Sequence, residues 1–280
     1  MLLALTLSLC ACGDDFDLKE FIKKYMTDEG LVSRDPGYIE TRENELYQYE
    51  VYEDHVMLTA YIGEANVVIL PSSIDGLPVT VIGTLCFYTG NSEVTNVTIP
   101  SSVKRLDDSA FYLCTKLEML VVPETVERIG ERCFGWCESL RSVTLPSSLT
   151  EIPAYCFNYC TSLETISIPS VCTMIGTRAF SYCSALTTVT LPPVTAEIGA
   201  KVFAECESLD FLLLPDSLKA IGEGLLDGSD KCLIIASASS TAAMYCDTNS
   251  LTFYTTLADA EAAKGYGDSD QSDQSEQSDE

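Results

Sequence analysis

Cysteine is the residue type of this sequence whose number and spacing could support chemistry. The chain of 280 residues contains 13 cysteines, and five of them recur every 23 residues, at Cys114, Cys137, Cys160, Cys183 and Cys206. Cysteine thiolates bind metals, form disulfides or act as nucleophiles. Buried thiols also serve as small apolar packing groups, so the column has an architectural interpretation as well.

A metal site and a nucleophilic site are both disfavoured by what surrounds these cysteines. The only histidine, His55, precedes the column, and a zinc site made of cysteine alone needs four converging thiolates rather than a row. A reactive thiol needs a nearby base or helix N-terminus that lowers its pKa. We therefore expect no metal, no cofactor and no catalytic residue, so the protein is not expected to be an enzyme.

Disulfides within the repeat are possible but not favoured. Neighbouring rungs of a stacked structure stand about 4.8 Å apart, yet parallel Cβ vectors suit the dihedral of a bridge poorly. Two pairs lie four residues apart, Cys133 with Cys137 and Cys156 with Cys160, but Ala179 takes the first place of the pair in a later rung. The exchange of cysteine for alanine indicates that this position requires a small buried side chain. The sequence does not decide whether the two cysteine pairs are oxidised or reduced.

Other residue types repeat with the same period, which is the signature of a stacked solenoid. Segment 140–146 (LRSVTLP) alternates apolar and polar side chains and predicts a short strand that the proline ends. One rung cannot bury its inward face alone, so neighbouring rungs must stabilise it. A phenylalanine column joins the cysteines as the predicted structural ladder, at Phe111, Phe134, Phe157, Phe180 and Phe203.

The repeated unit, [AC]-F-x-x-C-x-S-L-x-x-[VI]-x-[IL]-P-x-x-[VL]-x-x-I-G, resembles the BspA-like leucine-rich repeat, a 23-residue subtype of bacterial surface proteins. The resemblance covers about residues 56–254, or roughly seven rungs. It implies a β-rich, right-handed leucine-rich-repeat solenoid with short strands. A β-hairpin at 45–62 and a strand–helix–strand segment at 233–254 are expected to cap its two ends.

The N-terminal stretch MLLALTLSLCACG has an apolar run followed by small residues and cysteine. It is too short to span a membrane and resembles a bacterial lipoprotein signal, which implies lipidation of Cys12; an uncleaved hydrophobic terminus is the alternative.

Segment 14–26 places apolar residues on one face of a predicted helix. The expected parts are a lipoprotein signal peptide at 1–11, an acidic linker with a short amphipathic helix at 12–44, a leucine-rich repeat domain with end caps at 45–254 and an acidic disordered tail at 255–280.

The net charge of −26, from 16 basic and 42 acidic residues, disfavours nucleic-acid partners and anionic lipid surfaces, because both require clustered lysine and arginine. We expect a monomer that contacts the membrane through a lipid anchor only.

The outward strand positions form one predicted binding surface. Threonine suits exposed strands by β-propensity alone, whereas exposed apolar residues among them could anchor a partner. These positions are Met119, Val121, Arg141, Thr144, Thr165, Thr188, Phe211 and Leu213.

A second predicted surface is an aromatic column, in which Trp136, Tyr159 and Tyr182 each precede a cysteine. The rings could grip a glycan or a peptide, or could stack on one another to seal the core; both interpretations stay open.

These patterns favour a non-catalytic protein of the bacterial cell surface, lipid-anchored or secreted. The resemblance implies binding or adhesion to an extracellular protein or glycan. The alternative is a structural cell-envelope protein without a specific ligand.

Overall fold

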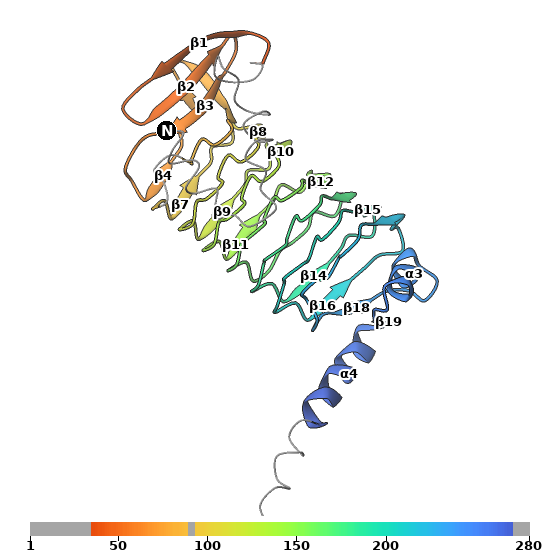
Figure 1. The fold of residues 1–280 in the computed structure, drawn as a ribbon. Helices are drawn as coiled ribbons and strands as arrows, with labels where there is room; N and C mark the ends of the chain where they lie inside the picture. The colour runs from red at the N-terminus through yellow and green to blue at the C-terminus, as the bar shows by residue number, and fades with distance from the viewer. Residues whose placement is uncertain (1–34, 89–92, 271–280) are drawn as a thin grey trace, which may run out of the picture.

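The chain is an elongated stack of similar turns, shown by a computed structural model that describes residues 35–88 and 93–270 (Figure 1). Each turn holds a first strand, a second strand and a tight backbone turn that leads to the next rung. There are about eight such turns, where about seven were expected. The repeat solenoid predicted from the sequence is confirmed.

The first strands lie side by side along one face. Consecutive rungs pair in parallel with a step of 23 residues, as in Met119 opposite Ser142 and Thr188 opposite Phe211. The first strands and the closing strand are β4 (Val67–Ile69), β7 (Asn96–Thr98), β9 (Met119–Val121), β11 (Ser142–Thr144), β14 (Thr188–Thr190), β16 (Phe211–Leu213), β18 (Leu233–Ile235) and β19 (Phe253–Tyr254).

Thr165 was expected on a first strand, but segment 165–167 forms none. Two backbone bonds that lead into this rung, from the Glu164 amide to the Arg141 carbonyl and from the Thr187 amide to the Glu164 carbonyl, are both long at 3.3 Å. These two bonds keep the rung attached to its neighbours, but residues 165–167 form no regular strand between them. As a result, the first strands divide into two four-stranded sheets, β11-β9-β7-β4 and β14-β16-β18-β19.

The second strands lie on the opposite side of each turn and are also divided into two sheets. The break falls between β10 and β12, where Pro153 replaces the glycine that follows the strand in other rungs. At Gly176 the equivalent amide donates to the Ile152 carbonyl at 2.8 Å, and proline has no N–H to make this bond. The second strands are β6 (Leu77–Ile82), β8 (Arg105–Leu106), β10 (Arg128–Ile129), β12 (Glu151–Ile152), β13 (Met174–Ile175), β15 (Glu197–Ile198) and β17 (Ala220–Ile221).

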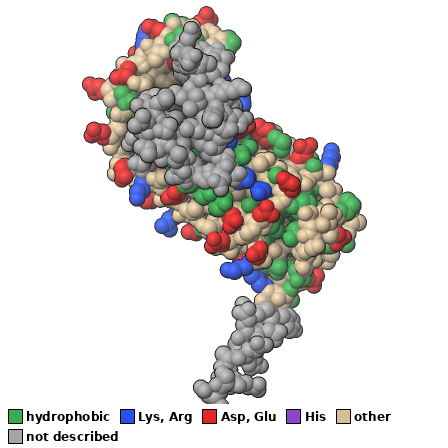
Figure 2. Space-filling view, viewed as in Figure 1, with side chains coloured by type: hydrophobic (Ala, Val, Ile, Leu, Met, Phe, Trp, Pro, Cys, Tyr) green, Lys and Arg blue, Asp and Glu red, His purple; other side chains and the backbone are tan. Residues whose placement is uncertain are grey.

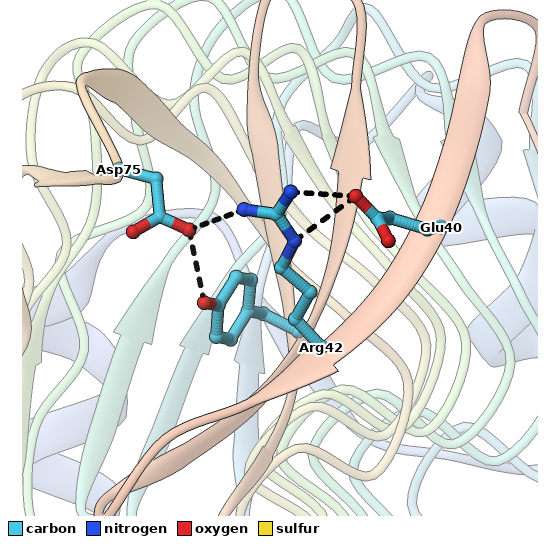
Figure 3. Close-up of polar contacts among 4 residues, drawn as sticks. Glu40, Arg42 and Asp75 are labelled. Carbon is cyan, nitrogen blue, oxygen red and sulfur yellow. Dashed lines mark hydrogen bonds and ion pairs between the residues drawn. The ribbon is translucent and has the colours of Figure 1, made fainter.

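The N-terminal cap contains the expected hairpin at 45–62 and adds a third antiparallel strand in front of it. Its strands are β1 (Tyr38–Glu43), β2 (Tyr47–Tyr52) and β3 (Val56–Tyr61), and β3 pairs in parallel with β6. The sequence pattern missed β1 because its side chains are polar or exposed on both faces. An antiparallel ladder to β2 holds this strand, and on its exposed face the Arg42 guanidinium binds Glu40 at 2.6 Å and Asp75 at 2.7 Å (Figure 3). Asp75 follows the short strand β5 (Ser73–Ile74), which pairs with β6.

The C-terminal cap has the predicted strand–helix–strand order, β18, α3 (Thr241–Thr248) and β19. Ser240 caps the helix, since its hydroxyl accepts a hydrogen bond from the Ala243 amide at 3.1 Å.

A second helix, α4 (Leu257–Asp270), occupies the first part of the segment expected to be a disordered tail at 255–280. Ala260 is fully buried, and the Lys264 ammonium binds the Asp210 carboxylate and lies 5.0 Å from the centre of the Phe211 ring. These contacts fix the helix on the last rungs, and they could not be read from its local composition. No helix in the part of the chain described is long and apolar enough to cross a membrane.

The core is a continuous column of stacked phenylalanine rings. The centroids of successive rings lie 4.8 to 5.6 Å apart, from Phe87 to Phe203, and the rings are almost completely buried. Such offset stacks bury large aromatic areas and favour a fixed ring geometry, so the column holds the rungs in register.

Candidate binding surfaces

The cysteine column lies inside the turns and is fully buried. The Sγ atoms of Cys137, Cys160, Cys183 and Cys206 donate hydrogen bonds of 3.2 to 3.3 Å to the carbonyl of a phenylalanine in the preceding rung. In the last rung Ser229 takes the same place, and its hydroxyl donates to the Phe203 carbonyl at 2.7 Å. Serine and cysteine can both donate a hydrogen bond, but serine is not apolar. The presence of both residues in this column indicates that the position requires a hydrogen-bond donor.

Burial decides the chemistry of these thiols. Removal from water disfavours the thiolate, so it raises the pKa of Cys206 to about 12 and the pKa of Cys160 well above its usual value. The cysteines within the described ranges carry no disulfide, including the pairs Cys133/Cys137 and Cys156/Cys160. A neutral, enclosed thiol is neither a nucleophile nor a metal ligand.

Metal ligands do not converge elsewhere either. Within residues 35–88 and 93–270, no group of three or more His, Cys, Asp or Glu side chains could hold a metal ion. Cys12 and the signal-like stretch 1–11 lie outside the described residues, so lipidation of Cys12 stays a prediction.

The backbone turns between rungs carry two columns of residues, of which the sequence analysis singled out only the aromatic members of the second. Both have positive φ, between 54° and 73°, a conformation that favours glycine. We call the surface formed by these two columns the turn face. The first column is Ser109, Arg132, Tyr155, Arg178, Lys201 and Gly224; the second is Leu113, Trp136, Tyr159, Tyr182, Glu205 and Gly228. The signal that could have revealed them is the pair Gly224 and Gly228 in the last rung.

The predicted aromatic column lies on the turn face and is stacked on itself. The centroid of Tyr159 lies 4.0 Å from that of Trp136 and 4.1 Å from that of Tyr182, with the ring planes within 16° of parallel. Both faces of Tyr159 are therefore covered by its neighbours, and nothing can insert between the rings. A ligand therefore cannot stack on Tyr159, so the geometry at the middle of the column supports the sealing role better than a stacking grip on sugars.

The predicted sheet surface contains an exposed aliphatic patch at its N-terminal end. Val67, Ile69, Met119 and Val121 are 61%, 74%, 55% and 64% exposed. They project from β4 and β9, on either side of β7, with which both strands pair. We call these four residues the aliphatic patch. Val67 and Ile69 were missed because an insertion before β7 shifts the first rung out of the 23-residue register.

The remaining predicted surface residues continue along the first strands. Arg141, Thr144, Thr165 and Thr188 are exposed. Phe211 and Leu213 are half-buried, because α4 packs on this end and places Lys264 over the Phe211 ring. The two aromatic and aliphatic anchors expected at the C-terminal end are thus less accessible than the aliphatic patch at the other end.

The second strands carry a shallow, open depression of about 220 Å³. Glu151 and Glu197 flank Met174 in it, and Thr150, Thr173 and Ala196 complete its lining. The depression is open to solvent rather than enclosed. Acidic side chains are distributed along the solenoid, with basic side chains between them (Figure 2).

Known proteins share this architecture. A family model described as the BspA type leucine rich repeat region matches residues 68–123 and 107–233 in six copies. The crystal structure of a T. pallidum leucine rich repeat protein is 30% identical, covers 70% of this chain and 81% of that chain, and has a TM-score of 0.51. A leucine-rich repeat protein from Eubacterium ventriosum is 23% identical, with 73% of this chain and 54% of that chain covered and a TM-score of 0.57. The comparison with curated proteins finds no match.

Proposed function

The chain belongs to the BspA-type leucine-rich repeat family, and on that premise we propose that it is a non-catalytic binding scaffold of the bacterial cell surface, which attaches to an extracellular protein through the aliphatic patch. The stacked core leaves function to outward side chains, because the thiols and phenylalanines are enclosed.

The observation that carries this proposal is the exposure of four aliphatic side chains on one sheet. Strands at a water-exposed face normally carry polar residues, as Thr188 and Thr190 do on β14. Two pairs of aliphatic side chains lie on β4 and β9, with the polar outward residues Asn96 and Thr98 of β7 between them. Exposed apolar groups gathered in this way mark an interaction site. Aliphatic groups suit the apolar side chains of a protein better than a glycan, whose hydroxyl groups need polar partners.

The edge of this sheet adds a second recognition element. β4 pairs with β7 on one side only, and the described part of the chain contains no strand on its other side. The Ile69 carbonyl accepts a hydrogen bond from the Tyr47 hydroxyl at 3.4 Å, and an extended peptide can add to the other backbone groups of an edge that carries no strand. We propose that the partner contributes an apolar extended segment here.

The surface location is part of the same proposal. It is supported by family membership and by the resemblance of residues 1–12 to a lipoprotein signal, with Cys12 as the lipid-bearing residue. The acidic surface favours a partner that is neutral or cationic.

The test begins with residues 13–280 on an array of extracellular matrix proteins and glycans. The double variant Ile69→Thr/Val121→Thr keeps β-branched side chains on exposed positions, so we expect an unchanged melting temperature but an affinity at least about tenfold lower. The matched control is Thr190→Ser, at the equivalent place of β14, and it should bind normally. Equal binding by the double variant and the control would refute the patch as the contact. Absence of any partner across a complete array would favour the purely structural envelope role.

A further inference from the structure

Apolar side chains replace polar ones at outward positions of two neighbouring rungs on the second-strand side of the solenoid. Val171 and Val194 take a place at which the rungs on either side carry serine. Met174 on β13 takes a place that is charged on β10, β12 and β15. We call these three residues the apolar row, and their exposed fractions lie between 37% and 43%. Outward positions of a sheet are normally polar, so the apolar row indicates a contact surface.

Two carboxylates lie beside the apolar row. In the ladder of second strands, Met174 pairs with Glu151 on one side and with Glu197 on the other. The three side chains line the open depression of about 220 Å³. Among the described residues, neither glutamate carboxylate forms an ion pair. The depression therefore presents an apolar side chain between two negative charges that the described part of the chain leaves uncompensated.

This combination selects the chemistry of an occupant. A calcium ion takes six to eight oxygen ligands, and within residues 35–88 and 93–270 no group of three or more ligands could hold a metal. A cationic side chain with an aliphatic stem matches both features, because such side chains bury the stem on apolar surface and keep the charge in water. Arginine binds best as a planar fork on one carboxylate, whereas the compact lysine ammonium has three donors that can serve two separate carboxylates.

We propose that a lysine side chain of an extracellular partner protein docks in this depression, with its methylene stem on Met174 and its ammonium group between the Glu151 and Glu197 carboxylates. Neighbouring strands lie about 4.8 Å apart, so an ammonium above Met174 is one strand spacing from each glutamate backbone. A glutamate side chain spans that distance. Val171 and Val194 contact apolar side chains that flank the lysine in the partner.

This surface is separate from the aliphatic patch. Figure 1 shows β12 and β15 along the edge of the stack that lies away from β14 and β16. The inference therefore does not depend on binding at the aliphatic patch, and a scaffold with both surfaces can hold two partners at once. The net charge of −26 also attracts a cationic partner before contact.

The test uses a fluorescein-labelled peptide of five lysines, with binding to the protein measured by fluorescence anisotropy. The salt concentration is 0.15 M, at which attraction between exposed charges is largely screened beyond about 8 Å. We expect Glu151→Gln/Glu197→Gln to raise the Kd at least about fivefold. The matched control is Glu138→Gln/Glu207→Gln, which removes the same charge from exposed glutamates elsewhere and should change the Kd less than about twofold.

A second pair of variants tests the contact with the stem. Met174→Gln leaves the charge of the protein unchanged and removes the apolar surface, so we expect the Kd to rise about threefold. Met244→Gln is its control, because Met244 is an exposed methionine on α3, and it should bind like the parent. The melting temperature of each variant should stay close to that of the parent, because all the substituted side chains are at the surface.

Three results would overturn the proposal. Equal weakening by the two double glutamine variants would mean that the peptide responds to the overall charge alone. Unchanged binding by Met174→Gln would mean that no stem lies on the methionine. Tighter binding of spermine than of the lysine peptide, measured by displacement, would assign the depression to a free polyamine instead of a protein.

Discussion

Replacing Cys160 with alanine and with serine separates the two possible roles of the thiol column. The Cys160 side chain is fully buried, and its Sγ donates to the Phe134 carbonyl at 3.2 Å. Alanine removes the sulfur and its hydrogen bond, and the Phe134 carbonyl keeps only the bond from the Cys137 amide at 3.3 Å, so the lost bond costs about 0.5–1.5 kcal/mol. The small cavity adds about 1 kcal/mol, so we expect a loss of roughly 1.5–2.5 kcal/mol.

Serine should be tolerated better at this position than alanine. It keeps a donor in the place that Ser229 occupies naturally in the last rung, where the hydroxyl reaches the Phe203 carbonyl. Only the smaller volume is then lost, so about 1 kcal/mol is expected. If the thiol only fills space, the alanine variant should be more stable than the serine variant, because burying a hydroxyl costs more free energy than burying a methyl group.

The assay is urea unfolding in the presence of a reductant, with the midpoint compared between variants. A stack of repeats can unfold in steps, so the m-value is checked before a free energy is derived. At Cys133, whose place is taken by Ala179 and Val202 in later rungs, the order should reverse and alanine should be the milder change. A serine variant at Cys160 that is less stable than the alanine variant would refute the donor role.

Three further predictions concern other parts of the fold. Gly199→Ala should unfold the central rungs, because its Cβ would lie 2.4 Å from the Thr177 amide nitrogen; circular dichroism would show this, and native-like melting would contradict it. The pKa of Cys206 is raised to about 12 by burial, so the neutral thiol favours the folded state below the unfolded pKa, and this contribution falls as the pH rises from about 9 toward 12. Iodoacetamide at pH 8 should therefore label the buried thiols only in denaturant, and labelling of the native ladder would disprove their enclosure. Lys264→Ala should release α4 from Phe211 and speed proteolysis after residue 255 without lowering the melting temperature of the solenoid, whereas unchanged proteolysis would mean that other contacts fix the helix.

The repeat could be predicted because each column reports the same environment several times. Phe157 alone is one apolar residue, but five phenylalanines at one spacing indicate a core stack. Elements outside the period lacked this support: β1 is polar on both faces, and α4 depends on Lys264 reaching Asp210 across the chain.

The positive φ angles of the turns could not be predicted from the sequence for a different reason. Positive φ is normally read from glycine or asparagine, and at Trp136 and Arg178 large side chains occupy these positions. The donor role of the thiols was also missed, because the exchange of Cys133 for alanine in later rungs indicated simple packing. Only the serine at 229, together with its distance to Phe203, distinguishes a donor from a small apolar group.

The two breaks in the sheets give the molecule a mechanical joint. The ladders stop at Pro153 on one side and at segment 165–167 on the other, yet the tight turns stay bonded through the same region, as from the Trp136 amide to the Asn158 carbonyl at 2.7 Å and from the Tyr155 amide to the Thr177 carbonyl at 2.9 Å. The turns thus form an unbroken spine along one edge, while regular strand pairing stops on both sheet sides near the midpoint, where Glu164 keeps one backbone bond to each neighbouring rung. The rungs are therefore joined more continuously along the turn edge than across either sheet. At the midpoint the connection between the two halves of the solenoid thus depends on the turns and the phenylalanine stack more than on the sheets.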